Sequence, residues 1–167
     1  MQKRKYIFLA IFLSVNFVYS QTVISSQNAT ASAYLVVPLS IAATIGDLDF
    51  GNILLAGSPI KTTIAPRDGK LFVVSGHPNR RVTFTFEDVL LDNANWVVSS
   101  GGVVDNLTFV PKVILENGRR VKNGKSKKLR LNGSIGKLNV WVGGSIKISA
   151  DQEVGEYVGR FTLSVNY

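Results

Sequence analysis

Apolar and polar residues alternate one by one along several short runs of this chain, a period typical of half-buried β-strands. The clearest run is the last, in which hydrophobic residues and one glycine occupy every odd position: Tyr157, Gly159, Phe161, Leu163, Val165 and Tyr167. A shift of one residue in the pairing of this strand would bury Glu156 and Arg160, so its register is strongly specified. The same alternation predicts that Val82, Phe84 and Phe86 face the core.

Short runs rich in β-branched and aromatic residues recur along the chain, separated by Gly, Pro, Asn and Asp. We expect strands at residues 31–37, 48–55, 61–65, 71–75, 81–86, 95–99, 107–115, 128–131, 137–142, 145–149 and 156–166. No window shows a sustained 3.6-residue apolar period, so no amphipathic helix is expected. Many short strands at this spacing predict an all-β fold, either a sandwich or a barrel.

The Gly143-Gly144 pair lies between two of these runs and predicts a hairpin turn. A three-residue turn that includes Ser145 places Val142 opposite Ile146, which matches the apolar faces of the two strands. A two-residue turn would place apolar residues opposite polar ones. We therefore expect the longer turn, with a glycine at positive φ.

The start of the chain has the layout of a secretory signal peptide. Lys3, Arg4 and Lys5 form a positively charged region, and a mostly apolar stretch follows at residues 6–18. That stretch is shorter than the ~20 residues that a membrane-spanning helix needs. We therefore expect residues 1–20 to be removed on export. The mature protein is then periplasmic, on the cell surface or extracellular, with no membrane span.

After cleavage we expect a flexible start at residues 21–28 and one β-sandwich domain at residues 29–167. The odd positions from Ala29 to Val37 form an apolar stripe whose side chains increase in size. This stripe fits an added strand, in the protein's own sheet or in a neighbour's. Completion of its own sheet is favoured, because it leaves no exposed groove.

The composition of the chain removes several classes of chemistry. The 167 residues include no cysteine, which excludes thiol catalysis, disulfides and cysteine-ligated zinc. The one histidine, His77, lies in a Gly-His-Pro-Asn turn without a predicted partner for nucleophilic catalysis. Asp47 and Asp49 offer too few oxygens for calcium. Glu87 with Asp88 or Asp92 could form a glycosidase pair, but nothing in the sequence sets the separation of their carboxylates. We therefore expect no enzyme activity, no cofactor and no metal site.

The formal net charge of +8 is concentrated in one run. Seven basic residues lie within 12 positions that contain no acid: Arg119, Arg120, Lys122, Lys125, Lys127, Lys128 and Arg130. Asn-Gly pairs at residues 117–118 and 123–124 predict that the run is a basic hairpin tip or a long loop. Outside this run and the expected signal peptide the chain is slightly acidic, because 9 basic residues face 11 acidic ones.

The basic run has two interpretations. As a binding site it suits the phosphate or sulfate groups of a polyanion such as an anionic polysaccharide. No aromatic residue interleaves it to stack on bases, so we expect no nucleic-acid partner. Alternatively, it is a solvated segment that keeps a sheet edge from pairing, a common use of lysine.

Three stretches of the chain together resemble a known family. They are residues 38–42 (PLSIA) with 48–54 (LDFGNIL), residues 138–149 with their Val-Gly-Gly segment, and residues 155–161 (GEYVGRF) with 165–167 (VNY). The chain is similar over most of its mature length to the secreted bacterial family known as domain of unknown function four-four-zero-two. The resemblance implies a bacterial, exported protein with an immunoglobulin-like antiparallel β-sandwich. It implies no established activity.

The C-terminal layout is also similar to pilus subunits of the chaperone–usher type and to spore-coat-U-like proteins. In those proteins a glycine, an alternating strand and a final tyrosine follow one another, as from Gly155 to Tyr167 here. In such pilus subunits the terminal strand binds the assembly chaperone and borders a groove that a neighbour's N-terminal strand fills. This chain lacks the cysteine pair that many of them carry.

We therefore expect an exported, non-enzymatic structural or adhesive protein of the cell surface, such as a pilus-like subunit. It would bind copies of itself or other surface subunits by β-strand addition, with the alternating residues 157–167 as the assembly strand. The alternative is a monomeric binding module whose basic loop binds an anionic surface polymer.

Overall fold

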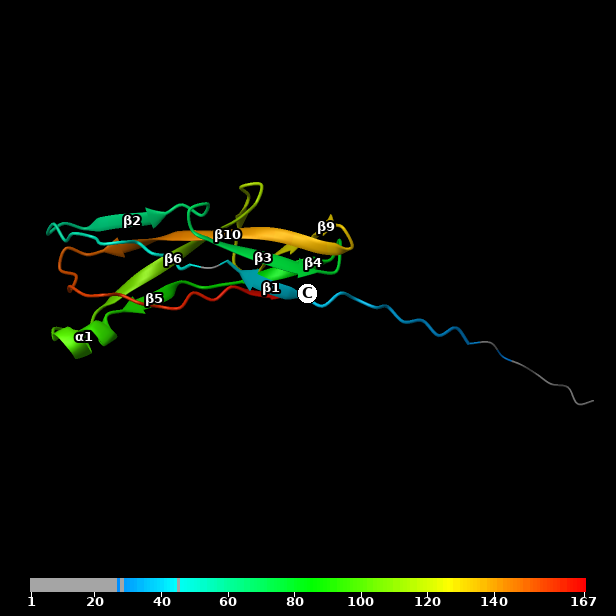
Figure 1. The fold of residues 1–167 in the computed structure, drawn as a ribbon, viewed down its shortest axis with the longest axis horizontal. Helices are drawn as coiled ribbons and strands as arrows, with labels where there is room; N and C mark the ends of the chain where they lie inside the picture. Colours follow the sequence, from blue (N-terminus) through cyan, green and yellow to red (C-terminus); the bar gives the residue numbers. More distant parts are fainter. Residues whose placement is uncertain (1–26, 28, 45) are drawn as a thin grey trace, which may run out of the picture. The chain divides into compact units, whose positions relative to one another are not determined.

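The computed structural model describes residues 27, 29–44 and 46–167 (Figure 1). The expected signal peptide, residues 1–20, lies outside the described residues, as does most of the expected flexible segment 21–28. The chain divides into two compact units, Met1–Tyr34 and Leu35–Tyr167. All the strands described belong to the second unit.

The unit Leu35–Tyr167 consists of two antiparallel β-sheets and one short helix (Figure 1). The larger sheet contains β1 (Ser40–Ala43), β2 (Ile60–Ile64), β3 (Lys70–Gly76), β5 (Val89–Asp92), β6 (Asn106–Leu115), β7 (Arg120–Val121), β9 (Arg130–Asn132) and β10 (Ile135–Ile148). The smaller sheet contains β4 (Arg81–Thr85), β8 (Lys125–Lys128) and β11 (Ser164–Asn166), and helix α1 spans Ala94–Ser100. The expected all-β, immunoglobulin-like antiparallel sandwich is confirmed.

Strand β10 is the central element of the larger sheet. Its 14 residues alternate in burial, and at about 3.3 Å per residue they extend over about 45 Å. On one side β10 pairs first with β3 and then with β2, and on the other side with β9 and then with β6. The two ends of β10 therefore mark two opposite ends of the sandwich.

The predicted hairpin at Gly143-Gly144 is wrong, because β10 continues through both glycines without a turn. Gly143 lies where β3 gives way to β2, and a Cβ atom there would lie 2.4 Å from the Ile64 carbonyl oxygen. A Cβ atom on Gly144 would lie 2.4 Å from Cε2 of Phe109. The pair thus permits close packing of neighbouring groups, which in a strand is as common a use of glycine as a turn.

Other strand predictions are also wrong. Residues 31–37 lie in no strand. Residues 48–55 also lie in no strand. There the Gly51 N–H donates to the Asp49 side chain at 2.8 Å, an Asx turn with Gly51 at a φ of 68°. Residues 95–99 lie in α1, where the hydroxyl of Ser99 donates to a backbone carbonyl of the preceding turn.

The core lies between the two sheets, and the C-terminal segment contributes to it. The predicted inward orientation of Val82, Phe84 and Phe86 is confirmed, since all three are buried. The ring of Phe161 packs against Phe86 and other core rings, with centroid distances of 6.1–6.4 Å. Burial of one such aromatic side chain stabilises a fold by about 1.5–3 kcal/mol. The C-terminal segment is therefore held in place mainly by its apolar side chains.

Candidate functional site

The candidate functional site is the C-terminal segment, because β11 is an edge strand of the smaller sheet. The strand order there is β11-β4-β8, and β11 pairs with β4 through Ser164–Thr85 and Asn166–Thr83. No other described strand pairs with β11. The free side of an edge strand presents unpaired backbone N–H and C=O groups, to which another strand can pair.

The side chains of this segment are already used within the domain. Leu163 is buried, whereas Tyr157, Phe161 and Val165 are partly buried. The even-numbered positions Arg160, Thr162, Ser164 and Asn166 are exposed, as the two-residue period predicts. Gly159 and Tyr167 belong to the predicted apolar positions but are exposed. The feature available for binding is therefore the backbone of the segment and not its apolar face.

The hydrogen-bonded strand is shorter than the predicted strand at residues 156–166. The segment first bridges the larger sheet, where Val158 and Asp92 exchange backbone hydrogen bonds of 2.9 and 3.1 Å. It then joins the smaller sheet at Ser164. Between these points a hollow of about 390 Å³ separates residues 85–90 from the exposed side chains of the segment. The ladder is interrupted because the segment changes sheets there.

The opposite edge of the smaller sheet, β8, carries a different set of side chains. Lys125 lies opposite Phe84 and Lys127 lies opposite the buried Val82, so both lysines lie on the core-facing side of the sheet. Lys128 lies opposite Arg81 on the outer side. Lysine side chains on an edge strand hinder pairing with other strands. The smaller sheet thus has one edge blocked by lysines and one uncharged edge, β11.

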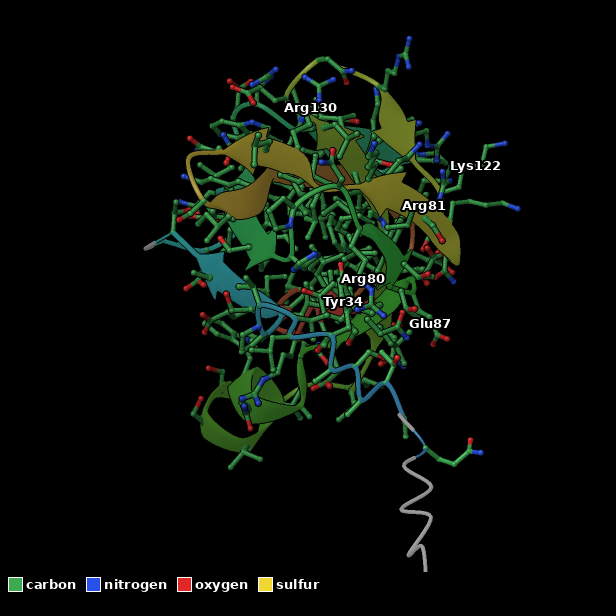
Figure 2. The ribbon with its side chains drawn as sticks, turned by 90° about the vertical axis from the view of Figure 1, so that its right-hand side faces the viewer. Tyr34, Arg80, Arg81, Glu87, Lys122 and Arg130 are labelled. Carbon is green, nitrogen blue, oxygen red and sulfur yellow. The ribbon has the colours of Figure 1, made fainter. Side chains whose placement is uncertain are left out.

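The predicted basic hairpin tip or long loop is wrong, because the run is divided among three strands of two sheets. Arg120 lies in β7 of the larger sheet, Lys125–Lys128 form β8 of the smaller sheet, and Arg130 lies in β9 of the larger sheet. Figure 2 shows Arg130 apart from Lys122. Arg119 and Arg120 are exposed beside the turn after β6. The structure therefore places the three lysines of β8 on an edge strand of the smaller sheet, whereas Arg119 and Arg120 lie beside the larger sheet.

The C-terminal residue, Tyr167, binds residues near the start of the sandwich unit and in the turn after β3. The Tyr167 hydroxyl donates to the Val37 carbonyl and accepts from the His77 N–H, both at 2.7 Å. The guanidinium of Arg80 lies over the Tyr167 ring at 4.6 Å from its centroid. Sequence reasoning placed Tyr167 on the assembly strand but missed these contacts. The signal available was a terminal aromatic side chain with a polar tip, which usually finds a hydrogen-bond partner.

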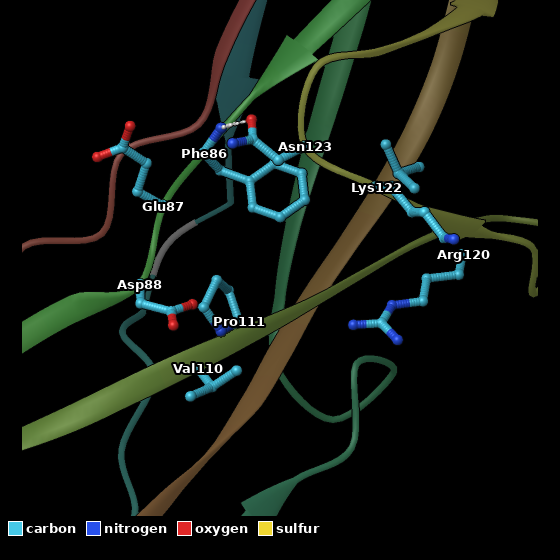
Figure 3. A pocket seen from close by; sticks show the side chains of 9 residues that line it. Phe86, Glu87, Asp88, Val110, Pro111, Arg120, Lys122 and Asn123 are labelled. Atoms are coloured by element: carbon cyan, nitrogen blue, oxygen red, sulfur yellow. Dashed lines mark hydrogen bonds between the residues drawn. The ribbon is translucent and has the colours of Figure 1, made fainter.

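A second hollow, of about 560 Å³, lies beside the segments that join β4 to β5 and β7 to β8, where the chain passes between the two sheets (Figure 3). Phe86 and Pro111 line it, and the Phe86 N–H donates to the Asn123 side chain at 3.0 Å. Figure 3 shows Glu87 and Asp88 with side chains that point in different directions. Two carboxylates of a glycosidase must instead face one bond from opposite sides. This hollow therefore does not assemble the pair that the sequence left open.

A polar network fixes the start of the C-terminal segment. Backbone N–H groups of Asn106 and Glu153 donate to the carboxylate of Asp105 and lower its pKa, an effect that outweighs desolvation. The Tyr157 hydroxyl donates to the Glu153 carbonyl at 2.8 Å, and burial is the main cause that raises the pKa of Tyr157. Gln152 joins both side chains through its amide nitrogen. Tyr157, the first residue of the predicted assembly strand, is therefore held neutral and in one position.

A family model described as Domain of unknown function (DUF4402) matches residues 39–167. The chain belongs to the DUF4402 family. The match includes both sheets and every residue of the candidate site, which confirms the family resemblance of the sequence motifs. A search of curated proteins finds no match to the chain.

Two further kinds of feature, a metal site and a membrane-spanning helix, are not found among the described residues of this DUF4402 protein. No group of three or more His, Asp or Glu residues in that part is arranged to hold a metal ion. No helix among the described residues is long and apolar enough to cross a membrane. The open edge of β11 and the lysine-bearing edge of β8 are thus the features on which a functional proposal for this family member rests.

Proposed function

We propose that this DUF4402 protein is an exported structural or adhesive subunit of the bacterial surface that assembles by β-strand addition at the open side of β11. The observation that carries the proposal is the difference between the two edges of the smaller sheet. Lysines block β8, whereas the three residues of β11 carry no charge. Protection of one edge alone is the arrangement expected where the other edge receives a strand.

The donor strand in this proposal is the apolar stripe of residues 29–37 from a second copy. Leu35 is 88% exposed, and residues 31–37 belong to no strand in their own chain. A strand of about six residues forms about six backbone hydrogen bonds, each worth about 1 kcal/mol net. Alternate side chains, here alanines followed by Leu35 and Val37, then set the register.

The test compares substitutions at the open edge with matched substitutions on the neighbouring strand. Ser164→Lys with Asn166→Lys adds two charges to β11, in imitation of β8. Thr85→Lys with Thr83→Lys adds the same charges to the directly opposite residues of β4, which has neighbours on both sides. The measurement is the solution mass of each purified protein at high salt, where screened ionic contacts do not contribute.

We expect the parent and the β4 variant to assemble and the β11 variant to remain monomeric. A parent that is a monomer at every concentration under these conditions contradicts strand addition. So does a β11 variant that assembles as the parent does. Cooperative unfolding of the β11 variant would show that its loss of assembly is not a loss of fold.

A second function, binding of an anionic polysaccharide, is supported by one observation. Arg81 lies directly opposite Lys128 on the outer side of the smaller sheet, and neither forms an ion pair within the described part of the chain. Two adjacent unpaired cations suit sulfate or phosphate groups. The test is retention on a heparin-like matrix, given with the predictions below.

A further inference from the structure

One end of the sandwich carries an exposed apolar surface, which we call the acidic end for the charges around it. It lies at the C-terminal end of β10 and includes α1, which buries none of its residues (Figure 1). Its large apolar side chains are exposed, with Val98 at 89% and Val154 at 70%. The others are Trp96, Val103 and Val104. Apolar side chains gathered in this way usually mark an interaction surface.

The charged side chains of the two segments that carry this surface are all negative. Residues 92–105 and 148–158 contain no lysine or arginine and five acids: Asp92, Asp105, Asp151, Glu153 and Glu156. Backbone N–H groups donate to the carboxylates of Asp92 and Asp105. An anionic lipid surface attracts basic segments and repels acidic ones. The charge therefore favours a partner that is positively charged.

The opposite end of the same molecule has that character, and we call it the basic end. Leu131 and Ile135, 63% and 38% exposed, lie on the β9–β10 hairpin at the start of β10. Residues 77–81 and 125–137 contain no acid and seven basic residues: Arg80, Arg81, Lys125, Lys127, Lys128, Arg130 and Lys137. About 45 Å of β10 separates the two ends, several times the Debye length of about 8 Å. The opposite charges of one molecule thus do not neutralise each other.

We propose that the acidic end of one molecule binds the basic end of a second copy, head to tail. Exposed valines and Trp96 would meet Leu131 and Ile135, with acids and bases paired around them. Contacts between two like ends are disfavoured because they bring like charges together. A head-to-tail contact that does not close into a ring produces an open chain of molecules. This contact does not require strand addition, since it uses neither β11 nor residues 29–37.

The small apolar area makes this contact weak and dependent on ionic strength. Stable interfaces usually bury about 800 Å² on each partner, whereas only a few side chains project at each end here. Complementary charge at such a contact mainly governs orientation and the rate of encounter. We therefore expect additional self-association at low salt, beyond any strand addition, that is lost at high salt.

The experiment is sedimentation velocity of the purified chain over a range of concentrations at low and high salt. Lys128→Glu with Arg130→Glu reverses charge at the basic end, and Asp151→Lys with Glu153→Lys reverses charge at the acidic end. All four side chains are exposed. Each variant alone is expected to lose the part of its self-association that depends on salt. In a mixture of the two variants, the unchanged acidic end of one suits the unchanged basic end of the other, and the two reversed ends suit each other as well, so the mixture is expected to form complexes in which the two variants alternate.

Matched controls reverse the same number of charges away from both ends. Lys112→Glu with Arg119→Glu and Asp68→Lys with Glu116→Lys act on exposed residues beside the middle of β10. Both controls are expected to associate as the parent does. Val98→Ser with Val154→Ser is expected to weaken association at least about tenfold without a change in charge.

Several results would overturn the head-to-tail contact. A parent that sediments as a monomer at low salt rules it out, as do end-reversed variants that associate like the parent. Failure of the mixed variants to form a complex while both remain folded has the same meaning. Association that persists at high salt and disappears in the β11 variant would instead support strand addition alone. Binding of the parent to anionic vesicles through Trp96, detected by its fluorescence, would assign the acidic end to a membrane.

Discussion

The assignment of Gly143 and Gly144 to the interior of β10 leads to a sharp prediction for Gly144→Ala. The new Cβ atom would lie 2.4 Å from Cε2 of Phe109 and 2.5 Å from the Val110 carbonyl oxygen, whereas carbon atoms in contact lie about 3.5–4.0 Å apart. Phe109 is 3% exposed and its ring packs against Phe50 and Phe161, so it has little room to move by the required ~1 Å.

Overpacking of this kind costs about 1–3 kcal/mol, and replacement of a glycine returns about 0.5–1 kcal/mol through the unfolded chain. We therefore expect Gly144→Ala to lower the free energy of unfolding by about 1–2 kcal/mol. The assay is urea denaturation followed by circular dichroism. Phe109→Leu removes the clashing ring atoms, so it is expected to cost less in the Gly144→Ala background than in the parent. A Gly144→Ala midpoint at or above that of the parent would refute the close packing and support a solvent-exposed turn.

Further substitutions probe the candidate site. Tyr167→Phe removes the hydroxyl that donates to the Val37 carbonyl, and it is expected to lower the free energy of unfolding by about 1 kcal/mol. It is also expected to accelerate limited proteolysis before β1. Unchanged proteolysis would contradict a stabilising role of this hydrogen bond. The folded-state pKa of Asp105 is depressed, so its carboxylate stabilises the fold above the unfolded-state value of about 4 and this contribution is lost as the pH falls through the folded-state pKa. Asp105→Asn is therefore expected to flatten the acid side of the stability–pH curve, and a curve parallel to that of the parent would argue against this. Replacement of the lysines of β8 by glutamine is expected to reduce retention on a heparin-like matrix, and unchanged retention would eliminate the polyanion hypothesis.

The sequence predicts those features of the fold that depend on local alternation. Val82, Phe84 and Phe86 are buried as expected, and Leu163 and Phe161 face inward while their polar neighbours are exposed. A two-residue period determines which face of a strand is apolar without reference to any other part of the chain. The composition of the runs was likewise enough to predict the all-β class. The family motifs added the prediction of an immunoglobulin-like sandwich.

The wrong predictions concern contacts between distant parts of the chain. A Gly-Gly pair fits both a turn and close packing within a strand. The Phe109 ring, whose contact with Gly144 requires a glycine there, comes from a different strand. The basic run gave no sign that it crosses from one sheet to the other, because strand partners are set by long-range pairing. For the same reason the sequence could not reveal that β8 is protected while β11 is open.

The two proposed contacts are geometrically compatible. β1 begins at the basic end, where Ser40 pairs with Ser75, so the chain enters the sandwich at that end. In a head-to-tail chain this end faces the neighbour's acidic end, where the neighbour's C-terminal segment starts at Val158 beside Asp92.

A donor that lies along the neighbour's open edge from this point runs antiparallel to β11, the commoner pairing of strands. Its nine residues extend over about 30 Å, which matches the neighbour's segment 159–167. Reversal of charge at either end is therefore expected to slow strand addition, followed by light scattering, without changing its end point. Equal rates for the parent and the end-reversed variants would show that the two contacts are unrelated.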